Sequence, residues 1–321
     1  MDREGGARRR RPHAHGYAGD VDLQKLEYFL AVRDHGSINA AAGQLGVAQP
    51  TISHALKALE RDLGVDLFHR IGRGMVPTPA GHALAAPARR LLRAISSAVE
   101  VAGGVGGTVE IAAAPSPASG GFVDLLAAFR EQAPSVAVRL GRMRDERAGL
   151  DQLRDGDVEL LLTHLPLEAV TDPRFSDHRL ESLPLGVQEY WYAAPPGTPL
   201  PPEGEPVPLT EIPTIPLLIV PQAVVADDIG RALAQVGRLP RPSAIVEHRE
   251  ARIDFIAAGI GASFIESTLV DQARSRGVEC RAVAPPVLRE YGLVFVGDDL
   301  SPAARAFVEF SRARQDAPGR R

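Results

Sequence analysis

Residues 37–64 read SINAAAGQLGVAQPTISHALKALERDLG, and the helix signals in this stretch decide the fold of the first third of the chain. Ser37 is suited to cap a short, alanine-rich helix. Gly46 is placed to end that helix, because glycine readily adopts the left-handed conformation found after helices. Pro50 fits the first turn of a second helix, where its missing N–H costs nothing. Two helices joined by a tight glycine turn are therefore predicted.

Two apolar faces are expected to hold this pair of helices together. The first helix should pack through Ala40, Ala41 and Leu45, and alanines let two helix backbones approach closely. The second helix is expected to bury four apolar residues at helical spacing, Ile52, Leu56, Leu59 and Leu63. The arrangement predicts a helix-turn-helix.

The side chains left on the outside of this pair are suited to reading DNA. A recognition helix reads base edges with short polar side chains near its N-terminus, and the helix dipole there favours phosphates. The residues expected to contact DNA from these helices are Ser37, Gln49, Pro50, Thr51, Ser53, His54 and Lys57. The alternative is a helical hairpin whose polar face is only solvated.

A two-stranded wing is predicted directly after the helix pair. Residues 66–70 (DLFHR) and 75–78 (MVPT) are strand-like, and residues 71–74 (IGRG) supply glycines for the turn. Arg70 and Arg73 are expected at the tip, where a guanidinium group can reach a phosphate or a minor groove.

The segments on either side complete a DNA-binding unit over residues 21–78. Residues 1–20, which include four consecutive arginines, are typical of a disordered basic arm. A helix ending near His35 should precede the pair and bury an apolar stripe, Leu23, Leu26, Phe29, Leu30 and Val32.

Residues 79–106 are predicted to form a linker and dimerisation helix. Its apolar residues alternate steps of four and three, the pattern of a coiled coil: Leu84, Ala88, Leu91, Ile95, Ala98 and Ala102. Pro87 should bend or restart this helix. The glycines at 103, 104, 106 and 107 predict a flexible joint after it.

Alternating strand and helix patterns follow the joint. Strands are expected at 108–113, 135–140, 158–163, 217–220, 244–247, 261–265 and 291–296. Helices are expected at 122–132, 147–154, 228–236, 252–258 and 302–312, and a loop at 195–216. Such alternation indicates an α/β fold with a mostly parallel sheet.

Composition and charge agree with a cytoplasmic protein of several domains. The chain has 321 residues and one cysteine, which excludes an internal disulfide and a cysteine zinc cluster. No stretch reaches the ~20 apolar residues of a membrane span, and the basic N-terminus lacks the apolar core of a secretory signal. Residues 1–103 carry 14 Lys+Arg and 10 Asp+Glu, whereas the remainder carries 22 and 30. The basic first third indicates a polyanionic partner.

These residues resemble the LysR-type family of transcriptional regulators. The most specific match is the run LQKLEYFLAV, GSINAAAGQLGVAQPTISHALKALERDLGVDLF and GRGMVPTPAG. The resemblance extends from Val21 to about Arg314, mainly through the layout of elements in the C-terminal part.

The resemblance implies a winged helix-turn-helix on a dimerising helix, joined to a periplasmic-binding-protein-like effector domain. That domain would span 107–314, with lobe one at 107–183 and 284–314 and lobe two at 184–283. The chain would cross between the lobes near residues 185–192 and return near Val283, and 315–321 would be a tail. Such regulators form dimers and tetramers on partly palindromic double-stranded DNA, and a small effector in the cleft changes DNA bending.

The sequence departs from the family pattern at four positions. Ala48 stands where a capping serine or threonine is usual, and His54 replaces a common arginine. Glu159 takes the place of an aspartate. The segment SFIE lacks the usual proline after the strand, which leaves Glu266 near the expected cleft.

Effector-binding candidates lie where strands end and helices begin, because free N–H groups there hold anions. The candidates are Ser116, Ser119, Thr163, His164, Gln222 and Phe264, the effector itself being unidentified. For Ser119 ordinary helix capping is the favoured alternative, and for His164 a satisfied buried polar group.

Enzyme signatures are missing from the chain. It contains no G-x-S-x-G or H-E-x-x-H motif, and GIGASF at residues 259–264 lacks the third glycine of a dinucleotide loop. We therefore expect neither catalytic residues, nor a metal, nor a cofactor. The alternative function is a ligand-binding or catalytic α/β protein whose N-terminal helices only mediate oligomerisation.

Overall fold

The computed structural model describes residues 22–102, 106–167, 180–220, 224–238 and 241–316. The chain divides into two compact units, residues 1–93 and 94–321. The expected basic arm at 1–20 lies outside the described residues, and so do 103–105 of the joint and 317–321 of the tail.

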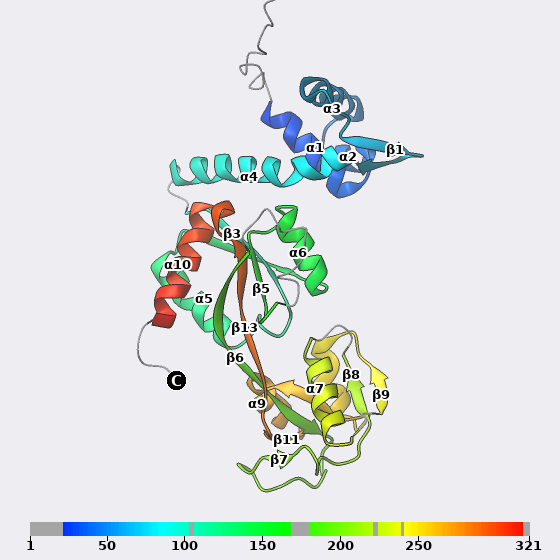
Figure 1. Ribbon diagram of the computed structural model, residues 1–321, viewed down its shortest axis with the longest axis vertical. Helices are drawn as coiled ribbons and strands as arrows, with labels where there is room; N and C mark the ends of the chain where they lie inside the picture. Colours follow the sequence, from blue (N-terminus) through cyan, green and yellow to red (C-terminus); the bar gives the residue numbers. More distant parts are fainter. Residues whose placement is uncertain (1–21, 103–105, 168–179, 221–223, 239–240, 317–321) are drawn as a thin grey trace, which may run out of the picture. The chain divides into compact units, whose positions relative to one another are not determined.

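The first unit is a helix-turn-helix followed by a wing (Figure 1). It contains α1 (Leu23–His35), α2 (Ile38–Leu45), α3 (Gln49–Leu63), β1 (Phe68–Ile71), β2 (Gly74–Pro77) and most of α4 (Pro79–Ala102). Each of the first three helices ends at a glycine with positive φ, namely Gly36, Gly46 and Gly64. The left-handed conformation at these positions lets the chain leave the helix sharply.

Capping differs between the two helices of the pair. The Ser37 hydroxyl accepts a hydrogen bond from the Ala40 N–H at 3.1 Å, as expected for an N-cap. Ala48 occupies the N-cap position of α3 and has no side chain that can accept one. Among the first three residues of α3, Pro50 has no N–H and the Thr51 N–H donates to the Ala48 carbonyl at 3.0 Å, so the Gln49 N–H is left for water or a bound partner.

In the first unit, Ile52, Leu56 and Leu59 of the predicted α3 stripe are buried and Leu63 is half-buried, but the expected face of α2 is corrected. Ala41 is buried, whereas Ala40 and Leu45 are exposed, and Ile38 and Ala42 take their places. The helix has only eight residues, so its contact face is set by Ile38 and the residues one turn later. Leu23, the first residue of α1, is also exposed.

The wing is a regular antiparallel hairpin with a shorter turn than expected. Ile71 and Gly74 pair in the ladder, so that only Gly72 and Arg73 form the turn. Gly72 has a φ of 60°, which a two-residue hairpin turn requires. The Met75 N–H donates to the Gly36 carbonyl at 2.8 Å and ties the wing to the end of α1.

Helix α4 is continuous through Pro87, which corrects the expected restart. Thr78 precedes the helix, and its hydroxyl oxygen accepts a hydrogen bond from the Gly81 N–H at 3.1 Å. In the predicted stripe, Ala88 is buried and Ile95 is half-buried, but Leu91, Ala98 and Ala102 are exposed, as is the neighbouring Val99. The predicted apolar stripe is thus mostly uncovered in its C-terminal half.

The first lobe of the second unit is a sheet covered on both faces. Strand β3 (Thr108–Ala113) is parallel to β4 (Ala137–Arg142) and β5 (Leu160–His164). Helices α5 (Gly121–Gln132) and α10 (Pro302–Asp316) cover one face through a cluster to which they contribute four phenylalanine rings. Helix α6 (Glu146–Arg154) covers the other face.

Two long strands run from the first lobe into the second (Figure 1). Strands β6 (Leu180–Ala194) and β13 (Val287–Val296) pair antiparallel along ten residue pairs, with an irregularity at Tyr291/Gly292. They join a seven-stranded sheet of order β10-β6-β13-β5-β3-β4, with β11 also paired to β6. The sheet is therefore mixed rather than mostly parallel, because the crossing strands run against their neighbours.

The second lobe is built from short strands and helices around these crossing strands. Its strands are β7 (Val207–Pro208), β8 (Leu217–Ile219), β9 (Pro242–Ile245), β10 (Ser263–Glu266), β11 (Glu279–Arg281) and β12 (Val283–Ala284). Its helices are α7 (Val224–Gln235), η3 (Arg249–Ala251), α8 (Arg252–Ala257), η4 (Ser267–Leu269) and α9 (Val270–Arg274); η5 (Gly297–Asp299) follows β13. The expected loop at 195–216 contains β7.

Two sequence features acquire structural roles in the second unit. The Gly106 N–H donates to the Ser135 carbonyl, and the Gly107 carbonyl accepts from the Ala137 N–H, so these joint glycines continue the β3–β4 pairing just before the two strands. The buried Glu159 carboxylate accepts hydrogen bonds from the Ser301 N–H at 2.6 Å and its hydroxyl at 3.1 Å, just before α10.

We predict that Ala48→Ser will stabilise the first unit. The backbone of Ala48 is extended (φ −69°, ψ 139°), the conformation of a capping serine, and the missing side-chain acceptor is worth about 1 kcal/mol. Denaturant unfolding followed by far-ultraviolet circular dichroism measures the change. Ala40→Ser, at an exposed position inside α2, is the control and should not stabilise; equal effects of the two substitutions would contradict the capping explanation.

Candidate functional sites

The N-terminal turns of α3 present the residues expected to contact DNA. Gln49, Pro50, Thr51, His54 and Lys57 are exposed there. Ser53 is half-buried. This orientation follows from the buried stripe, Ile52, Leu56 and Leu59, which fixes the rotation of α3 against the core.

The wing brings two arginines next to the start of α3. A groove of about 290 Å³ is lined by Ile38, Asn39, Gln49, Arg70, Gly72, Arg73 and Met75. The structure thus assembles Gln49, Arg70 and Arg73 from separate elements. Asn39 was not predicted; its polar side chain in the first turn of the short helix was the available signal.

Three cations elsewhere in the first unit take part in ion pairs. Lys25 pairs with Asp62 at 2.8 Å, and both Arg33 and Arg89 pair with Asp34. Within the described part of the chain, Lys57, Arg70 and Arg73 make no ion pair. Their charges are therefore available to a polyanion.

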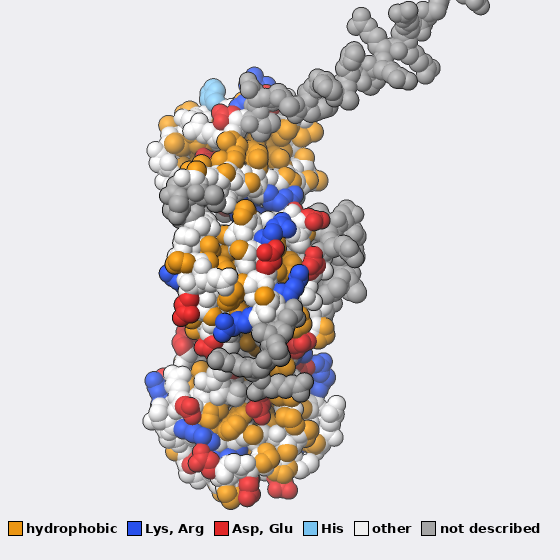
Figure 2. Space-filling view, turned by 90° about the vertical axis from the view of Figure 1, so that its left-hand side faces the viewer, with side chains coloured by type: hydrophobic (Ala, Val, Ile, Leu, Met, Phe, Trp, Pro, Cys, Tyr) orange, Lys and Arg blue, Asp and Glu red, His pale blue; other side chains and the backbone are white. Residues whose placement is uncertain are grey.

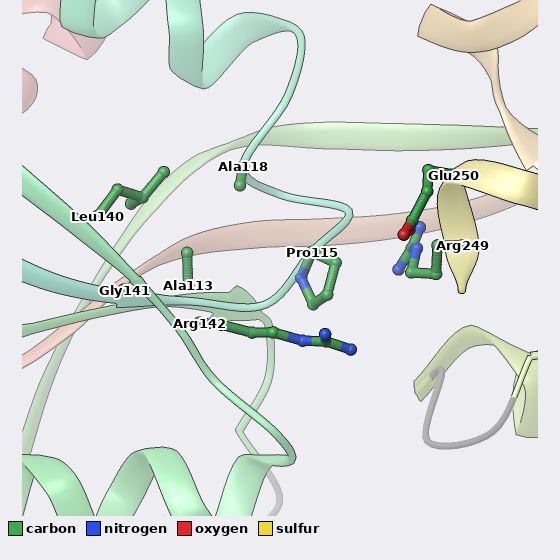
Figure 3. Close-up of a pocket in the computed structure, with 8 residues that line it drawn as sticks. All are labelled: Ala113, Pro115, Ala118, Leu140, Gly141, Arg142, Arg249 and Glu250. Atoms are coloured by element: carbon green, nitrogen blue, oxygen red, sulfur yellow. The ribbon is translucent and has the colours of Figure 1, made fainter. Parts of the chain in front are cut away.

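A second candidate site lies between the lobes of the second unit (Figure 3). The cavity has a volume of about 310 Å³ and is lined by Ala113, Pro115, Ala118, Leu140, Gly141, Arg142, Arg249 and Glu250. The first six residues lie at or beyond the carboxyl ends of β3 and β4, and the last two begin η3 of the second lobe. The position matches the expected location of a ligand site in an α/β fold.

A buried polar network lies at the junction of the lobes. The Ser116 carbonyl accepts a hydrogen bond from the Gln188 amide at 2.8 Å and another from the Ser119 hydroxyl at 2.8 Å. The Tyr190 hydroxyl donates to the Ser116 hydroxyl at 3.4 Å. Ser119 does not cap α5, whose N-cap is Gly120 without a side-chain bond, and this corrects the favoured alternative for Ser119.

His164 belongs to this network in its neutral form. Burial lowers the pKa of its imidazole to about 4, although a hydrogen bond to Gln188 opposes the change. Its Nε2 lies 3.1 Å from Gln188 Oε1. The Gln188 amide nitrogen donates to Ser116, so Oε1 must accept, and His164 therefore carries its proton on Nε2. Nδ1 is then a buried acceptor that has no partner among the described residues.

The second lobe contributes a buried ion cluster to the same region. Glu266 is 2% exposed and pairs with both Arg249 and Arg252. Burial alone would raise the pKa of Glu266, but the two guanidinium groups outweigh it and lower that pKa. Arg249 also donates to the Ser116 hydroxyl at 3.3 Å, so the cluster reaches across to the first lobe.

None of the six effector candidates is among the residues that line the cavity. Thr163 is buried within β5, and Phe264 packs in the core of the second lobe with its ring 5.6 Å from that of Tyr192. The structure does not bring Phe264 to the cleft, because in β10 it faces the apolar side of the sheet. Gln222 lies outside the described residues.

Sequence reasoning missed several residues of this region, Arg142, Gln188, Tyr190, Arg249 and Glu250. Gln188 and Tyr190 lie on a crossing strand that was predicted only as a passage between lobes. Their spacing of two residues, which places both on one face of a strand, was the available signal.

Other features of the described residues place limits on the chemistry. None of the described helices combines the length and the apolar character needed to cross a bilayer. The described residues contain no cluster of three or more side chains that could hold a metal ion. Burial raises the pKa of the Cys280 thiol to about 11, which keeps it protonated and weakly nucleophilic. Figure 2 shows basic and acidic side chains interspersed over one face of the second unit.

Comparison with family models matches both parts of the chain. Residues 23–82 match the bacterial regulatory helix-turn-helix protein, lysR family, and residues 102–316 match the LysR substrate binding domain. Among curated proteins, the transcriptional regulator TfdS of Cupriavidus pinatubonensis is 27% identical over 323 residues, covering 91% of this chain and 98% of that protein. TcbR of Pseudomonas sp. strain P51 is 28% identical over 305 residues, with the same coverage.

Solved structures resemble the chain over nearly its whole length. The crystal structure of CbnR, a LysR family transcriptional regulator, has a TM-score of 0.64 and 25% identity and covers 91% of this chain and 99% of that one. Full-length CbnR in complex with its target DNA has a TM-score of 0.63 at 25% identity, with the same coverage.

We predict that His164 makes the second unit lose stability in mild acid. The folded pKa lies below the ordinary value of 6.5, so the unfolded chain binds the proton more tightly and stability falls as the pH drops from 6.5 towards 4. This difference between the folded and unfolded pKa corresponds to a loss of about 3 kcal/mol in the free energy of unfolding. Denaturant unfolding at several pH values measures it, and the single tryptophan, Trp191 in β6, reports on this unit.

In this experiment His164→Asn should flatten the pH dependence relative to the unchanged protein. His248→Asn removes an exposed imidazole from the same unit and should leave the dependence as it is. Parallel curves for the unchanged protein and His164→Asn would contradict the assignment.

Proposed function

The chain belongs to the LysR family of bacterial transcriptional regulators, and from that membership we propose how its described surfaces bind DNA and an effector. It is a transcriptional regulator that combines a DNA-binding helix-turn-helix with an effector-binding domain. The proposals concern the residues that carry out each role, the assembly of the subunits and the location of the effector.

The observation that carries the DNA-binding proposal is the groove between α3 and the wing. Gln49 at the N-terminus of α3 lies beside Arg70 and Arg73, and all three are exposed. In this arrangement α3 enters the major groove while the arginines contact backbone phosphates or an adjacent minor groove. Thr51, Ser53, His54 and Lys57 extend the surface along α3, and Pro50 packs against the nucleic acid.

The uncapped start of α3 supports the same interpretation. Ala48 offers no side-chain acceptor, and the Gln49 N–H at the first position of the helix is available to a phosphate oxygen. Ser37 contributes differently, because its oxygen caps α2 and only its hydroxyl hydrogen can be donated to a phosphate.

Self-association is proposed to use α4. Its apolar side chains Leu91 and Val99 are exposed, which is typical of a helix that packs against a second copy. A dimer presents two copies of α3 to the two halves of a partly palindromic site, and a tetramer contacts two such sites. The CbnR complex shows a protein of this family on its target DNA.

The effector is proposed to bind in the cavity between the lobes. Ser116 and His164 lie in the polar network at the base of this region, and Arg249 links that network to the second lobe. Because the lobes are joined by the two long strands β6 and β13, a ligand that contacts both lobes can change their relative orientation. That change is proposed to alter the bending of bound DNA.

The remaining assignments rest on the family. We propose that the regulator is cytoplasmic and non-enzymatic, and that its domains are residues 21–78, 79–106 and 107–314. The alternative is a ligand-binding or catalytic α/β protein with N-terminal helices that only oligomerise. A mobility-shift assay with the DNA upstream of its own gene separates the two, because only the regulator shows sequence-specific binding that weakens steeply with salt.

We predict that Gln49→Ala will relax base preference. Loss of a bidentate contact to a base costs roughly 1–3 kcal/mol of discrimination at one position of the site. Binding to a set of operator variants measures it. Gln235→Ala, at an exposed position of α7, is the control. Equal weakening on every sequence would show that Gln49 is not a base reader.

We predict that Arg73→Ala will change salt dependence more than sequence preference. Loss of one phosphate contact reduces the slope of log affinity against log salt by about 1. Mobility shifts across a salt series measure the slope. Arg144→Ala, whose side chain is 79% exposed in the second unit, should leave the slope unchanged. A changed consensus with an unchanged slope would refute the phosphate role.

A further inference from the structure

The two faces of the wing differ in what lies beside them. Arg70 pairs with Met75 in the ladder, and both line the groove beside α3. His69 pairs with Val76, and Ile71 lies two residues after His69 on the same strand. Because side chains alternate along a strand, these last three residues share the opposite face, which we call the outer wing face.

The outer wing face exposes apolar surface. Ile71 is 64% exposed, more than any other large apolar side chain among the described residues of the first unit, and Val76 is 44% exposed. The two are diagonal neighbours across the hairpin, so that one partner can cover both. Such a partner gains free energy by removing this surface from water.

The charges next to this apolar surface indicate a polyanion as the partner. Arg73 occupies the turn and Arg70 the other face of the hairpin, and both are exposed. Neither makes an ion pair within the described part of the chain. DNA offers phosphates to the guanidinium groups and deoxyribose carbons to the apolar side chains, and isoleucine is among the residues that proteins insert into a minor groove.

The tip of the hairpin is slim only as far back as Ile71. Gly72 and Gly74 flank Arg73 and carry no side chains, so Arg73 alone projects from the turn. Figure 1 shows the hairpin extending outward from the helices of the first unit. The minor groove of B-DNA is about 6 Å wide, and paired strands lie about 4.8 Å apart before their side chains are counted. Arg73 can enter such a groove as it stands, whereas Ile71 behind it requires the groove to widen.

We propose that Ile71 and Val76 lie against the deoxyribose carbons of the minor groove beside each half-site and select flexible A·T sequence there over stiff A·T sequence. The inference rests on the proposed function, since it concerns the same DNA complex. A groove widens at less cost at TA steps, which unstack easily, than in A-tracts, which are stiff and narrow. Arginine alone would favour the A-tract, because a narrow minor groove attracts guanidinium groups. The outer wing face thus adds specificity at base pairs that no side chain reads.

The test measures the affinity of the full-length protein for matched duplexes by mobility shift. Hydroxyl-radical footprinting on the DNA upstream of its gene first locates the deoxyriboses that the protein protects in the minor groove beside a half-site. That stretch is then replaced by TATA or by AAAA, which present the same acceptors in the minor groove and differ in stiffness. The unchanged protein should bind the TATA duplex roughly fivefold to tenfold more tightly. Equal or tighter binding of the AAAA duplex, or the absence of protected deoxyriboses beside the half-sites, would overturn the proposal.

A substitution of Ile71 separates the apolar contact from a role in the strand alone. Ile71→Thr keeps a β-branched residue, and with it the strand propensity, but replaces apolar carbon with a hydroxyl. It should abolish the preference for TATA and leave the salt slope unchanged, because no phosphate contact is lost. Ile71→Val, which stays apolar, should retain the preference. Ile245→Thr makes the same change at a 68% exposed strand position of the second unit and should leave the ratio of affinities as it is.

The remaining outcomes distinguish this inference from the regulator function. A TATA preference that Ile71→Thr retains would show that Ile71 serves only the strand. Sequence-specific binding without a TATA preference would refute the contact of the outer wing face and keep the regulator, whereas no sequence-specific binding on the upstream DNA would refute the regulator itself. Analytical ultracentrifugation tests the other occupant: a change of oligomeric state in Ile71→Thr would show that the face packs against a second copy of the chain and would overturn the DNA contact. Far-ultraviolet circular dichroism verifies that each variant is folded.

Discussion

The packing of the α3 stripe against α1 and α2 is the constraint on which the DNA-binding surface depends. Ile52 and Leu59 are fully buried, and Ala41 of α2 is small enough to let the helices approach closely. This contact fixes the rotation of α3, so that Gln49 and Lys57 face solvent. The wing is held to the same core by the hydrogen bond from the Met75 N–H to the Gly36 carbonyl. The Phe68 ring of the wing also packs against the Phe29 ring, with 5.4 Å between the ring centroids. The position of the arginines therefore follows from buried apolar contacts.

The second unit depends on a different constraint, the sharing of two strands between its lobes. A long antiparallel pair cannot be bent freely, since its backbone hydrogen bonds must be kept. Strands β6 and β13 thus allow small changes of lobe orientation while they hold the cleft residues in register. Gln188 and Tyr190 reach the cleft because they lie on this pair.

Polar groups at the cleft are organised from a buried network outward. The Ser116 carbonyl sets the orientation of Gln188, which in turn sets the tautomer of His164. Arg249 connects this neutral network to the charged cluster around Glu266. A ligand that contacts Arg249 therefore acts on the neutral network and on the charged cluster. Through these contacts, binding in the cleft can change the relative position of the lobes.

Local patterns in the amino-acid sequence were enough to predict the helix-turn-helix, the wing, the linker helix and the α/β character of the remainder. Glycine, proline and cap residues act locally, and apolar spacing reports which face is buried, so Ser37, Gly46 and the stripe of α3 could be read directly. The exposed position of Gln49 and Arg73 followed from the same pattern.

Tertiary structure alone decided which face of α2 is buried, that Phe264 lies in a core and that the crossing strands make the sheet mixed. It also brought Arg142 and Arg249, distant in sequence, to one cavity. The physical reason is that strand partners and cleft walls arise from contacts between distant segments, and local spacing carries no information about which segments will meet.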